Sequence, residues 1–251
     1  MMFVRDLVSA IETLVPRASA AAWDNVGLLI GDRDAPCSRA LLTIDLTPAV
    51  IDEARAMNAS FVLAYHPPIF KPMKSFRARD LAYEAARAGL SVYSPHTAFD
   101  AAEFGTTATV AKRLGFTDEA VVLESSARVH SFAAPLDFAA FVALVKSAIG
   151  LEHVVVSAAR DHPVTRVCVC AGAASSFVDA AHDAGADTML VGELTHHDVL
   201  RARRLGLAVA MTFHSNTERV ALEPLAARLR EALPGVELRL SQADEDPLRV
   251  M

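Results

Sequence analysis

Short apolar runs alternate along the chain with longer segments in which apolar residues recur at helical spacing. The short runs are rich in branched residues and are bounded by polar or turn residues, which predicts buried strands. These strands are expected at residues 26–31, 40–46, 61–65, 90–94, 153–158, 165–172, 188–192, 207–213 and 236–240. The longer segments predict helices at 1–18, 48–58, 78–89, 106–115, 137–149, 175–184, 196–204 and 216–233.

The alternation of strands and helices predicts the α/β class, with partly parallel sheets that carry helices on their faces. A polar and apolar connection near residues 117–127 separates two such series. We therefore predict a first domain at residues 1–124 and a second at residues 125–251, and the C-terminal elements could pack back on the first domain.

Composition narrows the class of protein without identifying a function. The chain has 251 residues, 53% of them hydrophobic, and a net charge of −6. A negative chain is not expected to offer the broad basic surface that binds nucleic acid directly. The N-terminal segment predicts an amphipathic helix rather than a signal peptide, and no apolar run approaches the length of about 20 residues that spans a membrane.

Cysteine usage fits a reduced, cytoplasmic setting. The chain has three cysteines, and Cys168 and Cys170 lie within an apolar run of strand character. We interpret them as small buried side chains rather than as a metal or redox pair, because the C-x-x-C spacing is absent. Neither of the Gly-rich phosphate-loop motifs occurs, and the G-x-S-x-G motif of serine hydrolases is also absent.

Histidine and acidic residues gather where the predicted strands end, which is where open α/β sheets bind ligands. The residues concerned are His66, His96, Asp100, Glu193, His196, His197, His214 and Glu218. Imidazole suits zinc, iron, nickel and copper, and carboxylates can bridge two ions. Two ions roughly 3.5–4 Å apart can lower the pKa of a bound water and polarise the group that is attacked.

Each of these residues also has a simpler interpretation. His66 could end a strand in solvent, and Asp100 could cap a helix that begins near Ala101. His214 and Glu218 could belong to a helix start capped by Ser215 or by the following Asn216, with Glu218 in a capping box. His96 could be a ligand, a catalytic contact that orients ligands, or a structural residue.

Other residues are weaker candidates for the site. Glu193, His196 and His197 could lie near it or could only begin a capped helix. Trp23, Asp24 and Asn25 could line a cleft or could only form a turn before a strand. The cations Lys71, Lys74 and Arg77 could contact a phosphate or could belong to a solvated loop.

Five ordered motifs resemble the signatures of the Nif-three-like dinuclear metal-binding family, often labelled GTP cyclohydrolase I type 2-like. They read AAWDNVGLLIGD, AYHPPIFKPMKSF, VYSPHTAFDA, VGELTHHDVL and FHSNTERVAL, and they extend from Trp23 to Leu222. The resemblance implies two linked α/β domains with mixed sheets, a metal site in the cleft between them, and ring-like homohexamers. It also implies two divalent ions per chain (Zn, Fe, Mn, Co or Ni), with ligands at His66, Asp100, His214 and Glu218.

The chain departs from this resemblance at one position and lacks one segment. Many bacterial members carry two adjacent histidines where this chain has Tyr65 and His66. A tyrosine hydroxyl, with an ordinary pKa of about 10, is a poor ligand near neutral pH, so one ion could be held more weakly or His96 could assist. The chain is too short to hold the long central insertion of larger members.

Two functions follow from the resemblance. The first is a metal-dependent hydrolase that acts on a nucleotide-like substrate in the manner of a GTP cyclohydrolase, with His96 as a candidate catalytic residue. The second is a non-catalytic metal-binding scaffold or a protein-interaction and regulatory factor. Small-molecule substrates and copies of the chain itself are the expected partners, and no membrane partner is expected.

Overall fold

The computed structural model describes residues 1–117, 119–124, 126–158 and 161–251, which form two compact units. Unit 1 comprises Met1–Ala102 and Leu222–Glu245, and unit 2 comprises Glu103–Ala221 and Asp246–Met251. The division therefore falls earlier in the chain than the predicted one at residue 124. Ser125, where the predicted second domain begins, lies outside the described residues.

Unit 1 is built on a sheet that has five strands within the described residues, in the order β1-β4-β3-β2-β11. These strands are β1 Gly27–Ile30, β2 Arg39–Thr43, β3 Phe61–Ala64, β4 Ser91–Ser94 and β11 Glu237–Leu240. Neighbouring strands from β4 to β11 run parallel, and only β1 is antiparallel to its partner β4. The parallel core explains the continuous burial of β3 and β4, because both faces of such strands are covered.

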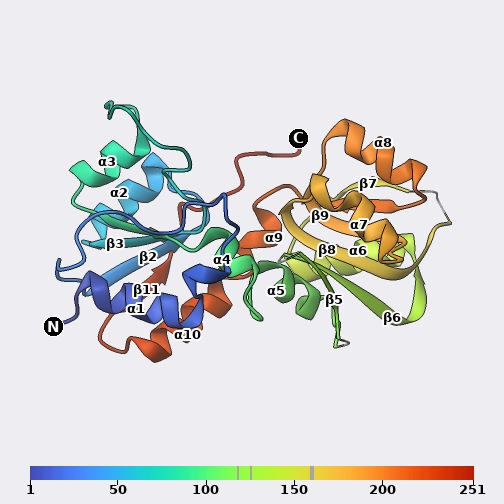
Figure 1. Ribbon diagram of the computed structural model, residues 1–251, viewed down its shortest axis with the longest axis horizontal. Coiled ribbons are helices and arrows are strands. Elements are labelled where there is room, and N and C mark those ends of the chain that lie inside the picture. Colours follow the sequence, from blue (N-terminus) through green and yellow to red (C-terminus); the bar gives the residue numbers. More distant parts are fainter. Residues whose placement is uncertain (118, 125, 159–160) are drawn as a thin grey trace. The chain divides into compact units, whose positions relative to one another are not determined.

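The helices of unit 1 cover both faces of this sheet. They are α1 Val4–Leu14, α2 Pro48–Ala56, α3 Leu81–Arg87, α4 His96–Asp100 and α10 Leu222–Ala232, with a 3-10 turn at Arg17–Ser19. Figure 1 shows α2 and α3 on one face of the sheet and α1 and α10 on the other. Thr47 fixes the start of α2, because its side chain accepts a hydrogen bond from the backbone of Val50 and Pro48 occupies the first helical position.

Unit 2 is built on a sheet that has six strands within the described part of the chain, in the order β5-β6-β8-β9-β10-β7. These strands are β5 Val121–Leu123, β6 Ala127–Asp137, β7 Val155–Ser157, β8 Pro163–Ala173, β9 Thr188–Glu193 and β10 Ala208–Met211. The three central strands β8, β9 and β10 are parallel, and the outer pairings are antiparallel. The mixed sheets with helices on their faces confirm the predicted fold class.

Strands β5 and β6 are absent from our predictions because β5 is an apolar run of only three residues and the residues of β6 are neither continuously apolar nor cleanly alternating. Half or more of each strand is only partly buried or exposed. The predicted connection at residues 117–127 contains β5, which pairs with β6, and β6 in turn pairs with β8. Burial in β6 is confined to its first residues, so the pattern that predicts a strand is lost along most of its length.

The helices of unit 2 are α5 Thr106–Arg113, α6 Phe138–Ile149, α7 Val178–Asp183, α8 His196–Arg204 and α9 Asn216–Arg219, with a 3-10 turn at Ser175–Phe177. Strand β8 divides the hydrophobic core between the two faces of the sheet. Val167 and Val169 pack in one cluster with α5 and α6, and Cys168 and Cys170 pack in the other with α7. The cysteines are therefore buried structural residues, as predicted, and burial raises the pKa of the Cys168 thiol to about 12.

The prediction of one continuous helix over residues 216–233 is wrong. The segment forms α9, which ends at Arg219, and α10, which begins at Leu222. Pro224 is the third residue of α10, and proline has no backbone N–H and clashes with the carbonyl group four residues earlier. Proline is tolerated only in a first helical turn, so the helix has to restart just before it. The two units also divide between these helices.

None of the described helices combines the length and the apolar character that a membrane crossing requires.

Candidate functional site

His66 of unit 1 follows strand β3, and its imidazole is paired with a carboxylate that follows the neighbouring strand. Thr43 at the end of β2 pairs with Ala64 at the end of β3. The residues two positions further along, Asp45 and His66, are therefore neighbours, and His66 Nδ1 lies 2.9 Å from Asp45 Oδ1. An ionised carboxylate only accepts hydrogen bonds, so Nδ1 carries the proton and Nε2 is the lone-pair nitrogen of the neutral ring.

Asp100 is held by the tyrosine that replaces the expected first histidine. The Tyr65 hydroxyl donates a hydrogen bond to Asp100 Oδ1 over 2.6 Å, and Tyr65 is 2% exposed. Asp100 is the last residue of α4, so the alternative in which it caps a following helix is wrong. Tyr65 thus orients a candidate ligand.

His96 begins α4, and the Asp24 carboxylate holds its imidazole through a hydrogen bond. Its Nδ1 lies 2.9 Å from both carboxylate oxygens of Asp24, whose side chain is fully buried. Thr97 donates both its backbone N–H and its hydroxyl to the same carboxylate. Burial alone would raise the pKa of Asp24, but the hydrogen bonds from His96 and Thr97 and the charge of His96 together lower it to about 2.

The His96 ring lies next to other candidate residues of unit 1. Its centroid is 5.5 Å from the Tyr65 ring and 5.5 Å from the His66 ring. The backbone of His96 has a φ of +27°, a conformation that costs a residue with a Cβ on the order of 1–3 kcal/mol and that recurs at functional sites. The surrounding hydrogen bonds therefore hold His96 in a strained position.

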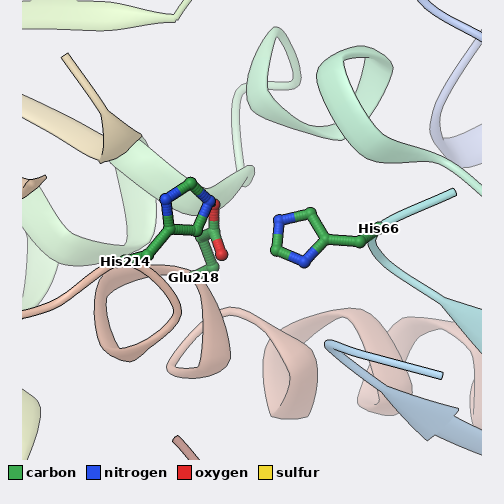
Figure 2. A group of neighbouring side chains, drawn as sticks. All are labelled: His66, His214 and Glu218. Atoms are coloured by element: carbon green, nitrogen blue, oxygen red, sulfur yellow. The ribbon is translucent and has the colours of Figure 1, made fainter. Parts of the chain in front are cut away.

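In unit 2, His214 lies between two acidic residues. Its Nδ1 is 3.0 Å from Glu193 Oε1, and its Nε2 is 3.4 Å from Glu218 Oε1. Glu218 is only 3% exposed. Figure 2 shows the imidazole of His214 and the carboxylate of Glu218 side by side. The sequence left the place of Glu193 open, and the structure makes it the hydrogen-bonding partner of His214.

The alternative in which this segment is only a capped helix start is not what the structure shows. Ser215 precedes α9 but makes no side-chain capping hydrogen bond, and Asn216 donates from its side chain to the carbonyl of Thr212. Phe213, immediately before His214, has a φ of +64°. The turn before α9 is therefore strained rather than capped.

Two glycines of unit 2 leave room for this pair, and neither was identified from the sequence. A Cβ on Gly172 in β8 would lie 2.5 Å from Glu218 Oε1 and 3.5 Å from His214 Nε2. A Cβ on Gly192 in β9 would lie 2.5 Å from the Gly172 carbonyl oxygen and 2.8 Å from that of His214. The backbone N–H of Gly172 also donates to the Thr217 hydroxyl, which ties β8 to α9.

The other predicted residues lie on exposed segments. His196 and His197 begin α8 and contact each other, with ring centroids 5.5 Å apart. Thr195 caps this helix, as the simpler interpretation expected. Lys71, Lys74 and Arg77 are exposed in the segment between β3 and α3.

Three of the candidate histidines share one arrangement that suits a metal ligand. His66, His96 and His214 each direct Nδ1 at a carboxylate, which fixes the ring and leaves Nε2 as the lone-pair nitrogen. Two ligands on one tetrahedral zinc-sized ion, with bonds of about 2.0–2.1 Å, are about 3.3 Å apart. The 3.4 Å between His214 Nε2 and Glu218 Oε1 fits that separation.

Several relatives and solved structures resemble the chain over nearly its full length. Protein NIF3 homolog from Schizosaccharomyces pombe is 33% identical, with 98% of this chain and 97% of that protein covered. A GTP cyclohydrolase 1 type 2 homolog from Clostridium perfringens is 26% identical, with 98% of each covered. A crystal structure of a hypothetical protein from Staphylococcus aureus has a TM-score of 0.90 at 22% identity, with 100% of this chain and 99% of that one covered, and it supports the fold.

The family comparison extends over residues 2–247, where the chain matches the profile of the family described as Duf34/NIF3 (NGG1p interacting factor 3). That range contains both sheets and every candidate ligand. The match therefore confirms the resemblance that the five sequence motifs carry. The chain belongs to the Duf34/NIF3 family.

Proposed function

We propose that this protein binds two divalent metal ions and uses them to hydrolyse a nucleotide-like substrate. His66 and Asp100 of unit 1 and His214 and Glu218 of unit 2 are the proposed ligands. The proposal joins the family resemblance to the local geometry of each unit. The name of the Clostridium perfringens relative, GTP cyclohydrolase 1 type 2 homolog, supports the class of substrate.

One observation carries the proposal. His66 and His214 are each held at Nδ1 by a carboxylate, Asp45 and Glu193 respectively. Metal-bound histidines in proteins almost always have this partner on the ring nitrogen that does not bind the metal. An imidazole that only ends a strand in solvent has no need of it.

The donor set fits a transition metal. His66, His214 and Glu218, the side chains drawn in Figure 2, each offer one ligand atom, two imidazole nitrogens and one carboxylate oxygen. Asp100 adds a second carboxylate. This mixture suits zinc, iron, manganese, cobalt or nickel, and the two carboxylates would offset half of the charge of two divalent ions.

When bound, such ions supply Lewis acidity and lower the pKa of water. The chain's own residues supply position and proton transfer. Tyr65 holds Asp100 in place, and Asp24 holds His96 through Nδ1. The opposite nitrogen of His96, Nε2, is the atom we assign to hold or move a proton during hydrolysis.

The first experiment measures bound metal by elemental analysis of protein prepared without chelator. We expect one to two ions per chain in the wild type and a large loss in His214→Ala and in Glu218→Gln. His196→Ala, which removes an exposed histidine of α8, is the matched control and should keep its metal. Less than one ion per wild-type chain, or an equal loss in the control, would contradict the proposal.

The second experiment separates catalysis from a scaffold role. Metal-loaded protein is assayed for turnover of GTP and of phosphoesters, with His96→Gln as the catalytic variant. We expect turnover in the wild type and its loss in His96→Gln at unchanged metal content. Full metal content without turnover would instead favour the second candidate, a metal-binding interaction factor, which the description "NGG1p interacting factor" of the family supports.

We also propose that the chain assembles with copies of itself, with a hexamer as the expected form. The edge strands of unit 2 support this, because β5 and β7 expose Val121, Val122, Val155 and Val156 by 44% to 51%. Exposed apolar edge strands are surfaces that proteins usually cover. Light scattering measures the particle mass, and a monomer at micromolar concentration would contradict the assembly.

A further inference from the structure

Two large aromatic side chains of unit 1 are exposed next to each other. Trp23, the only tryptophan in the chain, is 65% exposed, and Phe70 is 49% exposed. Their ring centroids are 5.9 Å apart at an interplanar angle of 62°. Scattered exposed apolar residues are ordinary, but adjoining aromatic rings on a surface mark a place where something binds.

The two rings are held by the residues that follow Trp23. Asn25 donates from its side-chain amide to the carbonyl of Ile69 over 2.5 Å, and this fixes the backbone just before Phe70. Asp24 holds His96 and Thr97. Two consecutive residues, Asp24 and Asn25, therefore hold His96 and the backbone before Phe70 next to Trp23, which lowers the conformational entropy lost when a ligand binds.

His96 links this aromatic pair to the candidate ligand His66. The His96 ring centroid is 6.2 Å from that of Trp23, 6.3 Å from that of Phe70 and 5.5 Å from that of His66. A ring stacked on Trp23 would thus lie about one ring away from His96, the residue to which we assign proton transfer. All of these residues belong to unit 1.

Positive charge follows Phe70 directly along the chain. Lys71, Lys74, Arg77 and Arg79 are four exposed cations within nine residues, in a chain of net charge −6. Their side chains form no ion pair with any residue that the structure describes. Exposed cations without acidic partners attract anionic ligands, and phosphates bind to such side chains.

We propose that Trp23 and Phe70 form a stacking platform for the base of a nucleoside phosphate, and that the cations of residues 71–79 bind its phosphate groups. A flat ring needs the aromatic faces, and a polyanionic tail needs the cations, so a nucleotide matches both features together. The inference rests on the proposed function in one respect, since it places the bound base near His66, a proposed metal ligand. It assigns substrate recognition to a segment that holds no metal ligand.

The single tryptophan provides a direct test, because the intrinsic fluorescence at 295 nm excitation reports on Trp23 alone. GTP, ATP and guanosine are titrated into metal-loaded wild-type protein and into protein stripped with chelator. We expect saturable quenching by GTP and ATP. Phe70→Ala should weaken the affinity for GTP roughly tenfold, the order of the stacking contribution of one aromatic side chain.

Two further variants distinguish the contribution of the aromatic platform from that of the cations. Phe76→Ala removes another exposed aromatic of the same segment, 60% exposed, and should leave the affinity unchanged. Combined Lys71→Ala, Lys74→Ala and Arg77→Ala should weaken GTP binding and reduce its salt dependence, with guanosine affected little. An equal loss with Phe76→Ala, or no saturable quenching by metal-loaded protein, would overturn the inference.

Metal content measured on the same samples separates this inference from the proposed function. Metal-bound protein that shows no quenching by nucleotide contradicts the platform and leaves the metal site standing. Nucleotide binding by protein that takes up no metal when metal is supplied contradicts the proposed function and supports the platform. A change in particle mass for Trp23→Leu would overturn the inference, because Trp23 would then belong to an interface between proteins.

Discussion

The two units hold their candidate ligands by different means. In unit 1 the support comes from polar side chains, with Asp45 on His66 and the Tyr65 hydroxyl on Asp100. In unit 2 Glu193 holds His214, but the decisive feature is the absence of side chains at Gly172 and Gly192, where a Cβ would meet Glu218 or the neighbouring backbone.

This difference indicates how each half can change. A hydrogen-bonding partner can be exchanged or weakened gradually. A position that admits no Cβ allows no gradual change, because any other residue must displace the backbone or Glu218. We therefore expect substitutions in unit 1 to tune the site and substitutions at the unit 2 glycines to abolish it.

The largest effect is expected for Gly172→Ala. The added Cβ would lie 2.5 Å from Glu218 Oε1, so the carboxylate has to move, and the metal affinity should fall by more than the roughly 10–100-fold that loss of a supporting partner costs. The overpacking should also cost roughly 1–3 kcal/mol of stability. Isothermal titration with Zn²⁺ and urea unfolding measure the two effects.

Gly185→Ala is the matched control for this substitution. Gly172 and Gly185 both have a positive φ, +65° and +78°, but a Cβ on Gly185 would meet nothing within 4 Å. The control should therefore show the backbone strain alone and keep its metal. If both variants lose metal equally, the space beside Glu218 is not what matters and the comparison of the two units fails.

The next largest effect is expected for loss of the carboxylates that hold His66 and His214. Asp45→Ala in unit 1 and Glu193→Ala in unit 2 should each lower metal affinity about 10–100-fold, as loss of such a partner usually does. Competition with a chelator of known affinity measures both. If only one of the two variants loses affinity, the proposed equivalence of His66 and His214 is broken.

A pH experiment tests the polar support of unit 1. The pKa of Asp24 is lowered from 3.8 to about 2 in the folded protein. The stabilisation is therefore complete above pH 4 and is lost as the pH falls towards 2, and it amounts to about 2 kcal/mol. Urea unfolding of the wild type and of Asp24→Asn between pH 5 and pH 2 should show their difference shrink across this range. Asp161→Asn, at an exposed position, is the control and should change little.

The smallest effect is expected for Tyr65→Phe. Loss of the hydrogen bond to Asp100 should cost about 1 kcal/mol and loosen that carboxylate, which a modest fall in metal affinity would report. Tyr93→Phe is the control, since Tyr93 is buried to a similar degree and its hydroxyl makes no hydrogen bond with a described residue. If the two variants are equally stable and bind metal equally, Tyr65 does not position Asp100.

The sequence allowed the fold class and the candidate ligands to be predicted. Ligands of open α/β sheets bind at the ends of strands, so the strand pattern pointed to the histidine and acidic residues that follow β3 and β10, and the family resemblance selected the four candidate ligands among them. Asp45 was not recognised as a site residue because the predicted strand 40–46 ran past the actual end of β2 at Thr43. With the correct end, the same reasoning would have identified it.

Other features depend on distances that no local pattern encodes. Gly172 and Gly192 resemble any glycine near a strand end, and only the approach of α9 shows why they are needed. The break between α9 and α10 could have been found, because Pro224 interrupts the helical segment. The hydrogen bond from Tyr65 to Asp100 could not have been predicted, because Asp100 lies 35 residues away in a helix too short to predict.

The position of β11 has a consequence for how the protein folds during synthesis. Glu237 in β11 pairs with Arg39 in β2, so the sheet of unit 1 is completed by a strand that leaves the ribosome almost 200 residues after its partner. Contacts at that separation slow folding, because a long loop must close before they form. Until then β2 is an open edge, which is prone to pair with other chains. Unit 2, whose strands all lie between Val121 and Met211, can form first and leave unit 1 as the last part of the nascent chain to fold.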